Sequence, residues 1–197
     1  MNKVKVLVEG YAKVNSDGTW DATSSMTLID TGSLKIIVDP GCNRELLLEA
    51  LKKENLKTSD IHYVFISHYH PDHCALMGVF GNATIYDSIQ WQKGSMGGDI
   101  VGSNLPQTDI EIIKTPGHCP EHASLSVNTE KGKVVVAADV FWWKAGEEQK
   151  VDIEKPDDFA SDISALKENR RKVLEIADFI IPGHGKMFKV ENEGLGE

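Results

Sequence analysis

The sequence predicts an α/β protein in which strands and helices pack in layers, and three observations support this. Several short runs are rich in β-branched and aromatic residues, which is typical of strands. Two longer segments repeat apolar residues at the spacing of an amphipathic helix. Histidines and aspartates follow directly after several apolar runs, as they would where strands of a layered sheet end at one edge. No linker or repeat divides the chain, so we expect a single domain over residues 1–197.

The first half of the chain has the pattern of a sheet with one covering helix. Strand-like runs occupy residues 3–8, 25–30, 34–39, 61–67 and 83–88. The first run alternates with a period of two, whereas the fourth, IHYVFIS, is continuously apolar and indicates a strand buried on both faces. The triplet Thr31-Gly32-Ser33 separates the second and third runs, which should form a hairpin. The leucines of residues 43–56 lie on one helical face, so this segment should be a helix.

The second half repeats this arrangement. The expected strands are residues 110–115, 122–129, 133–139 and 179–185. A helix is expected over residues 158–178, with Phe159 and Ile163 among the residues of its apolar side. Residues 89–108 are glycine-rich and lack a period, so we expect an irregular loop that either covers a site or is mobile.

Composition excludes some functional classes. Twenty-one Lys and Arg against thirty Asp and Glu give a net charge of −9, which argues against a large nucleic-acid surface. Three cysteines at irregular spacing do not form a disulfide framework, which favours a reducing compartment. The N-terminal apolar run is too short for a signal peptide, and no run reaches the length of a membrane span. We therefore expect a cytoplasmic protein that has no membrane partner; the sequence favours no oligomeric state.

The stretch SHYHPDHC, residues 67–74, concentrates metal-binding side chains. His68 and His70 are two residues apart, so on an extended segment they point to the same side. Pro71 is suited to the first turn of a helix, which would aim Asp72 and His73 in a different direction. Two pairs with different directions suit two adjacent metal ions better than one.

Three further polar residues follow apolar strands elsewhere in the chain: His118, Asp139 and His184. Any one of them alone is more often a structural histidine or aspartate than a metal ligand. With the four motif residues they make seven candidates, and seven can hold two metal ions with open positions if one carboxylate bridges them.

The motifs SHYHPDH, TPGH, VVVAAD and IPGHG occur in the order and approximate spacing of the metallo-β-lactamase superfamily, which the chain resembles from Lys3 to Val190. The segments GYA, DVF and RRKVLEIADFIIPGHG most resemble one small subgroup of it. The resemblance implies an αββα sandwich, with two mixed sheets flanked by helices and the metals at one edge.

The resemblance also implies roles for the candidate residues, each numbered in this sequence. The first metal would be held by His68, His70 and His118, the second by Asp72, His73 and His184, and the two would be bridged by Asp139. Asp39, in VDPGC, would orient a ligand histidine. The implied reaction is hydrolysis by a hydroxide that bridges the metals, with Asp72 as an additional candidate proton shuttle.

Several neighbouring residues have two interpretations. His122 is a candidate for supporting a ligand or touching substrate, and a loop histidine is the alternative. Trp142 and Trp143 should point to opposite faces, so at most one faces the site, and Trp142 is the candidate. The three cysteines fit small buried hydrophobic residues better than ligands or redox sensors.

The resemblance leaves the substrate open. We expect two divalent metals, Zn²⁺ with Fe or Mn as alternatives, and a small ester or thioester substrate. The absence of an insert between His118 and His184, and of a further helical domain after His184, sets the chain apart from nucleic-acid-processing and glyoxalase II-type members. The alternatives are a phosphodiesterase or ribonuclease acting on RNA, an iron-dependent redox enzyme such as a persulfide dioxygenase, and a non-catalytic metal-binding scaffold. The histidine at position 70, where the oxygen-reducing branch has an acidic residue, favours hydrolysis.

Overall fold

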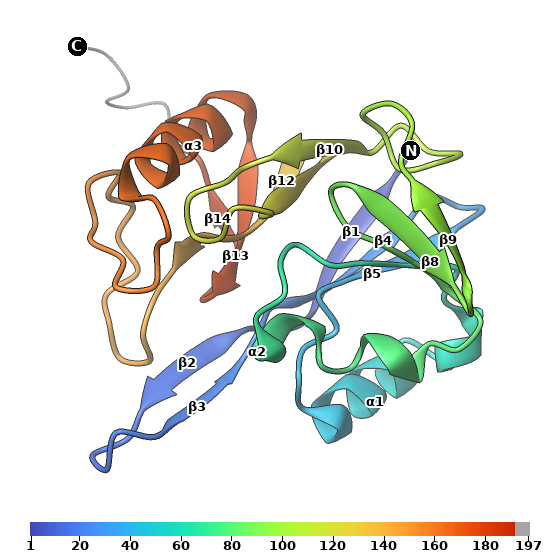
Figure 1. Cartoon of the computed structure of the whole chain (residues 1–197), viewed down its shortest axis with the longest axis horizontal. Helices are drawn as coiled ribbons and strands as arrows, with labels where there is room; N and C mark the ends of the chain where they lie inside the picture. The colour runs from blue at the N-terminus through green and yellow to red at the C-terminus, as the bar shows by residue number, and fades with distance from the viewer. Residues whose placement is uncertain (192–197) are drawn as a thin grey trace.

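A computed structural model describes residues 1–191, and within them two larger sheets pack face to face (Figure 1). The first sheet has the order β1-β4-β5-β6-β7-β8-β9. Its strands are β1 Lys3–Val8, β4 Met26–Asp30, β5 Lys35–Val38, β6 Tyr63–Phe65, β7 Thr84–Tyr86, β8 Gln90–Lys93 and β9 Met96–Asp99. It is mixed, because β5, β6 and β7 are parallel neighbours and the other pairs are antiparallel.

The second sheet has the order β10-β11-β12-β13-β14, and its only parallel pair is β12 with β13. Its strands are β10 Glu111–Lys114, β11 Ala123–Thr129, β12 Gly132–Trp142, β13 Phe179–His184 and β14 Phe188–Lys189. A separate hairpin of β2 Tyr11–Val14 and β3 Trp20–Thr23 projects away from both sheets (Figure 1). The helical segments are α1 Arg44–Lys53, η1 Thr58–Asp60, α2 Pro71–Cys74, η2 Met77–Val79 and α3 Ile163–Ile176.

The layers are held together by three apolar clusters. Ile29 and Phe65 of the first sheet meet Leu125, Val136 and Ile181 of the second in the central cluster. A fully buried side chain of this size contributes about 1.5–3 kcal/mol relative to an exposed one. The other two clusters lie on the outer faces of the sheets, so the order of layers is helix, sheet, sheet, helix. This confirms the predicted αββα sandwich.

Each long helix covers one outer face. Leu47 and Leu51 of α1 pack against the first sheet, and Leu166 and Val173 of α3 pack against the second. Figure 1 shows α1 and α3 on opposite sides of the molecule, with the sheets between them. No helix within residues 1–191 is long and apolar enough to cross a membrane.

Two sequence-based expectations were wrong. Residues 89–108 contain the hairpin β8–β9, whose turn includes Gly94 at φ 59°. Its exposed strands lie at the edge of the sheet and therefore lack the apolar alternation by which strands are recognised. Helix α3 begins after Asp162, whose side chain accepts a hydrogen bond from the Ala165 N–H. Phe159 therefore lies in the preceding loop and is exposed, and Ile163 is also partly exposed.

The hairpin β2–β3 was not expected from the sequence. Its strands pair from Tyr11 with Thr23 to Val14 with Trp20, around a turn in which Gly18 has φ 83°. The Asp17-Gly18 pair was a usable turn signal. The flanking residues carry no clear alternation, because most of the hairpin is exposed.

Candidate metal centre

The candidate ligands come from four places at one edge of the sandwich. Residues 68–73 lie in the loop after β6 and the start of α2, and His118 lies in the loop after β10. Asp139 lies inside β12, beside a register shift between Val136 and Ala138, and Ala138 has φ 44°. An irregularity of this kind changes the direction of the side chains that follow it. His184 is the last residue of β13. The structure thus brings all seven predicted residues to one edge.

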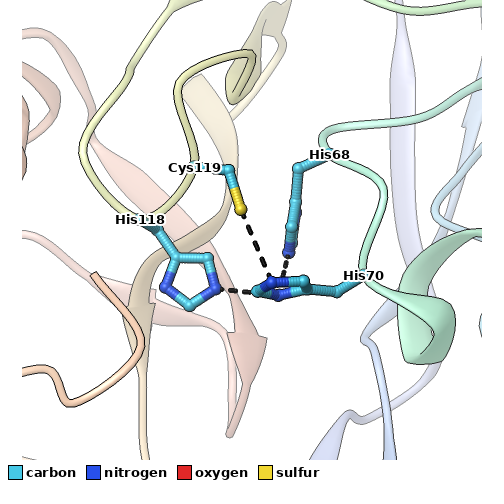
Figure 2. A group of neighbouring side chains, drawn as sticks. All are labelled: His68, His70, His118 and Cys119. Atoms are coloured by element: carbon cyan, nitrogen blue, oxygen red, sulfur yellow. Dashed lines mark hydrogen bonds between the residues drawn. The ribbon is translucent and has the colours of Figure 1, made fainter. Parts of the chain in front are cut away.

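The first group contains His68, His70 and His118. The Nδ1 atom of His70 lies 3.1 Å from Nε2 of His68 and 3.1 Å from Nε2 of His118. Figure 2 shows the rings of His68 and His118 turned toward the ring of His70. Three ring nitrogens therefore face a common point.

The second group contains Asp72, His73 and His184. Oδ2 of Asp72 lies 3.3 Å from Nε2 of His184 and 3.9 Å from Nε2 of His73. Pro71 is the first residue of α2, as predicted, and His73 lies in this short helix with its ring 4.2 Å, between centroids, from that of His68.

Asp139 lies between the groups and presents one oxygen to each. Its Oδ2 atom is 3.3 Å from Nε2 of His118 and 3.9 Å from Nε2 of His68. Its Oδ1 atom is 3.3 Å from Nε2 of His73 and 3.8 Å from Nε2 of His184. A carboxylate with this arrangement can contact two cations at once.

These spacings fit the edges of metal coordination shells. Ligands about 2.0–2.1 Å from a tetrahedral metal are about 3.3 Å apart from one another. Within residues 1–191, Nε2 of His73 and Oδ1 of Asp139 are buried and form no hydrogen bond. A buried polar atom left without a partner is costly, and a cation between these two atoms would satisfy both.

The outward-facing nitrogens of four histidines are held by acceptors. Nδ1 of His68 lies 2.9 Å from Oγ of Ser67, which donates to Asp39, and Nδ1 of His73 lies 2.9 Å from Oδ2 of Asp39. Nδ1 of His118 donates to Asp157 at 3.1 Å. Nδ1 of His184 donates to two backbone carbonyls, those of residues 11 and 23. Because these contacts take up the Nδ1 proton, each neutral ring presents an unprotonated Nε2 to the centre.

Burial and charge set the protonation states. Burial lowers the pKa of His68 well below the usual histidine range and also lowers the pKa of His70, so both rings are neutral. Burial alone would raise the pKa of Asp139, but His73 and His184 hold it well below the usual range, so Asp139 is ionised. Burial opposes the charge of His73, but Asp139 and Asp39 raise its pKa well above the usual range.

His118 behaves like His73. Burial opposes its charge, but the hydrogen bond to Asp157 and the charge of Asp139 raise its pKa. In the metal-free protein His73 and His118 therefore favour the protonated state, and a metal ion must displace those protons.

Comparisons with known proteins identify the family of this chain. The sequence model of the metallo-beta-lactamase superfamily matches residues 19–89. The chain is 32% identical to metallo-beta-lactamase domain-containing protein 1 of Xenopus laevis, over 98% of this chain and 84% of that protein. It belongs to the metallo-β-lactamase superfamily.

More distant relatives share the fold. An N-acyl homoserine lactonase of Bacillus cereus is 27% identical over 70% of this chain and 61% of its own length. A dizinc quorum-quenching lactonase, AidC, superposes with a TM-score of 0.67 at 17% identity, covering 89% of this chain and 79% of that one. A candidate metallo-beta-lactamase of Thermotoga maritima has a TM-score of 0.74 at 21% identity. The superposition covers 95% of this chain and 99% of that one. Superfamily membership identifies the chain as a metal-dependent hydrolase, and the Xenopus relative confirms the predicted subgroup.

In this metallo-β-lactamase fold a cavity of about 610 Å³ opens onto the metal centre. His70, Asp72, His118, Asp139 and His184 form its floor. The hairpin β2–β3 contributes one wall, which includes Val14 and Trp20, and the packed rings of Trp142 and Phe159 form another. Lys13, Asp21 and Lys144 are polar groups on these walls.

The other sequence candidates take different positions. Trp142 lines the cavity, whereas Trp143 packs in the cluster beneath α3. His122 is buried and does not line the cavity; its Nδ1 lies 2.9 Å from Oγ1 of Thr115, and burial lowers its pKa to about 3. Its ring packs 5.1 Å, between centroids, from that of His68. His122 therefore packs behind His68 and away from the cavity.

Cys119 is the cysteine nearest to the candidate ligands. Its Sγ lies 3.6 Å from Nε2 of His70, and Figure 2 shows the thiol pointing toward the ring of His70. Sγ also falls within the group of atoms, with His68, His70 and His118, that lie within 4.8 Å of one another. Burial raises the pKa of Cys119 to about 12, so the thiol is protonated in the metal-free protein.

Sequence reasoning missed two polar residues that support the ligands, Ser67 and Asp157. Ser67 directly precedes His68, so its position was a usable signal. Asp157 lies in the irregular loop before α3, 39 residues from its partner His118, and no local pattern marks it.

Proposed function

We propose that this chain is a dinuclear, zinc-dependent hydrolase of small esters, thioesters or lactones. The observation that carries the proposal is the position of Asp139, whose two carboxylate oxygens face two different groups of histidines. A single cation would leave one group without a role. The dizinc lactonase with the same fold supports zinc as the metal.

Two zinc ions, when bound, would activate a water molecule and polarise the substrate oxygen. The first would be held by His68, His70 and His118, the second by Asp72, His73 and His184, with Asp139 shared. The fixed Nδ1 contacts of four of these histidines keep their Nε2 atoms in place, so little reorganisation is needed during turnover.

Asp72 suits a proton acceptor as well as a ligand. Its side chain is 25% exposed and lines the cavity, whereas that of Asp139 is only 6% exposed. Burial raises the pKa of Asp72, but the contacts with His184 and His73 outweigh this and hold it below the usual range. The carboxylate is therefore ionised at neutral pH and can take a proton from the attacking water and return it to the leaving group.

The cavity walls favour a substrate with an apolar part. Val14, Trp20, Trp142 and Phe159 would contact an acyl chain or ring while the scissile bond lies over the metal centre. A cavity of about 610 Å³ suits a small molecule. The lactonase relative, whose name specifies an N-acyl lactone, supports this substrate class.

A second candidate is phosphodiester hydrolysis, including that of RNA. It is favoured by Lys13 and Lys144, which bring two positive charges to the cavity of an otherwise acidic chain. Charges of this kind would attract a phosphate group.

The test begins with metal analysis of the isolated protein. A panel of lactone, thioester, carboxylic ester, phosphodiester and RNA substrates is then assayed with and without chelator. We expect two zinc ions per chain, chelator-sensitive ester or lactone hydrolysis, and loss of both metal and activity in His68→Ala. Preferential cleavage of phosphodiesters would establish the second candidate. One iron per chain with oxygen uptake, or full activity after metal removal, would refute the proposed dinuclear zinc centre.

A further inference from the structure

The loop between β12 and α3 carries one buried carboxylate, that of Asp157, which lies next to the candidate ligand His118. Its side chain is fully buried. Oδ2 accepts one hydrogen bond from Nδ1 of His118 at 3.1 Å and another from Nε1 of Trp142 at 2.9 Å. Oδ1 accepts a third from the backbone N–H of Phe159 at 2.9 Å. One carboxylate therefore contacts a candidate metal ligand and both aromatic residues of one cavity wall.

The loop is held firmly enough for Asp157 to act as a fixed reference. Arg170, buried in α3, donates to the carbonyls of Ile153 and Lys155, at 3.0 and 2.6 Å. Nζ of Lys155 donates to the carbonyl of Trp142 at 2.8 Å.

The far end of the same loop is joined to the segment that carries His118. The N–H of Ser161 donates to the carbonyl of His118 at 3.0 Å, and that of Asp162 donates to the carbonyl of Gly117 at 2.9 Å. Two backbone hydrogen bonds thus join the two segments.

We propose that Asp157 is a positioning residue that couples the orientation of His118 to that of Trp142. The inference rests on the proposed function, because it assigns His118 to a metal and Trp142 to the substrate wall. A carboxylate that accepts from a ligand histidine fixes its ring and increases its basicity. The same oxygen also accepts the hydrogen bond from the Trp142 indole. A change in the orientation of His118 therefore alters the hydrogen bond of Trp142, and the reverse holds as well.

The coupling extends across the centre. The Trp142 ring packs 5.8 Å from Phe159 and 6.2 Å from His184, measured between ring centroids. His118 belongs to the first group of ligands and His184 to the second. Trp142 therefore touches the second group directly and the first through Asp157, and it forms the surface that an apolar substrate would contact.

Zinc titration of metal-free, ¹⁵N-labelled full-length protein tests this coupling. The chain has four tryptophans, and the Trp142→Phe variant assigns the indole N–H signal of Trp142. We expect that signal to shift when zinc binds to the unmodified protein. In Asp157→Ala we expect it to sit at a different position in the metal-free state and to lose most of its zinc response. The affinity for one of the two zinc ions should fall about 10–100-fold.

Two variants serve as controls. Asp158→Asn changes the neighbouring carboxylate, whose side chain is 84% exposed and lies 4.0 Å from Nζ of Lys144, so it should leave the Trp142 signal and zinc affinity unchanged. Asp157→Asn keeps the side-chain shape and should, like Asp157→Ala, lower the affinity for zinc. It serves as the test variant if the alanine variant does not fold.

The outcomes separate the two proposals. If the unmodified protein binds two zinc ions and hydrolyses esters, but the Asp157 variants bind both ions equally well, only the coupling is refuted. A Trp142 signal that does not respond to zinc would refute it as well. If the unmodified protein binds no metal, the proposed function fails and the coupling fails with it.

Discussion

The Oδ1 atom of Asp139 lies 3.3 Å from Nε2 of His73, and within residues 1–191 neither atom forms a hydrogen bond. Both atoms are buried, and in the metal-free protein the proton held by His73 compensates the charge of Asp139 at the boundary between the two ligand groups. Such a pair is destabilising unless a cation or proton satisfies it. The arrangement makes Asp139 the residue on which a shared metal centre depends.

Replacing Asp139 with Asn should therefore reduce metal binding at both positions. The amide keeps the size of the side chain but loses the charge that two cations would share. We expect less than two zinc ions per chain after gel filtration, and hydrolysis reduced by about 100-fold or more. Asp99→Asn, an exposed residue at the end of β9, is the matched control. A variant at position 139 that retains two zinc ions would contradict the shared role.

Gly183 offers an independent test of the same carboxylate. A Cβ atom at this position would lie 1.7 Å from Oδ1 of Asp139, so Gly183→Ala must displace the side chain or the strand. We expect loss of zinc and a destabilisation of about 1–3 kcal/mol, the usual cost of overpacking. Zinc stoichiometry and thermal unfolding of the chelated protein measure the two effects. Gly78→Ala is the control, because nothing lies within 4 Å of the added atom, and it should change neither zinc content nor stability. If the two variants behaved alike, the predicted clash between position 183 and Asp139 would be refuted.

The position of the site could be predicted from the sequence because its residues directly follow apolar strands. His68 and His184 lie within a few residues of the buried strand residues Phe65 and Ile181, and strands in a layered fold end at a shared edge. The edge hairpin β8–β9 could not be predicted, because its exposed strands have no apolar face. Asp157 could not be predicted either, because its role depends on a contact with His118 that only the folded chain creates. The periodicity of apolar residues predicts which residues are buried, but it does not predict polar contacts between distant loops.

Zinc binding should release protons at neutral pH. His73 and His118 have raised pKa values, so in the metal-free protein they hold protons above the pH at which an ordinary histidine loses them. A metal can bind only the unprotonated ring, so binding should release the protons that these two rings still hold at the pH of the experiment. Affinity should rise with pH until both groups have lost their protons. His122, with a pKa of about 3, contributes nothing in this range.

Calorimetric titration in buffers with different ionisation enthalpies measures this release. Asp157→Asn removes the carboxylate that raises the pKa of His118, so it should lower the number of protons released at pH 7. Absence of proton release in the unmodified protein at pH 7 would contradict the assigned protonation states.

The three cysteines should differ in reactivity, and one of them should report on the cavity. Cys42 is exposed and lines the cavity, Cys74 is intermediate and Cys119 is buried. Burial raises the pKa of Cys119 to about 12, which leaves almost no thiolate to react. In the native protein a disulfide reagent should therefore modify Cys42 first, and Cys119 only after unfolding. Because the group attached to Cys42 would occupy the cavity, modification should also inhibit hydrolysis. Cys42→Ser should lack the fast reaction and resist inhibition, whereas inhibition that persists in this variant would show that another thiol controls access to the metal centre.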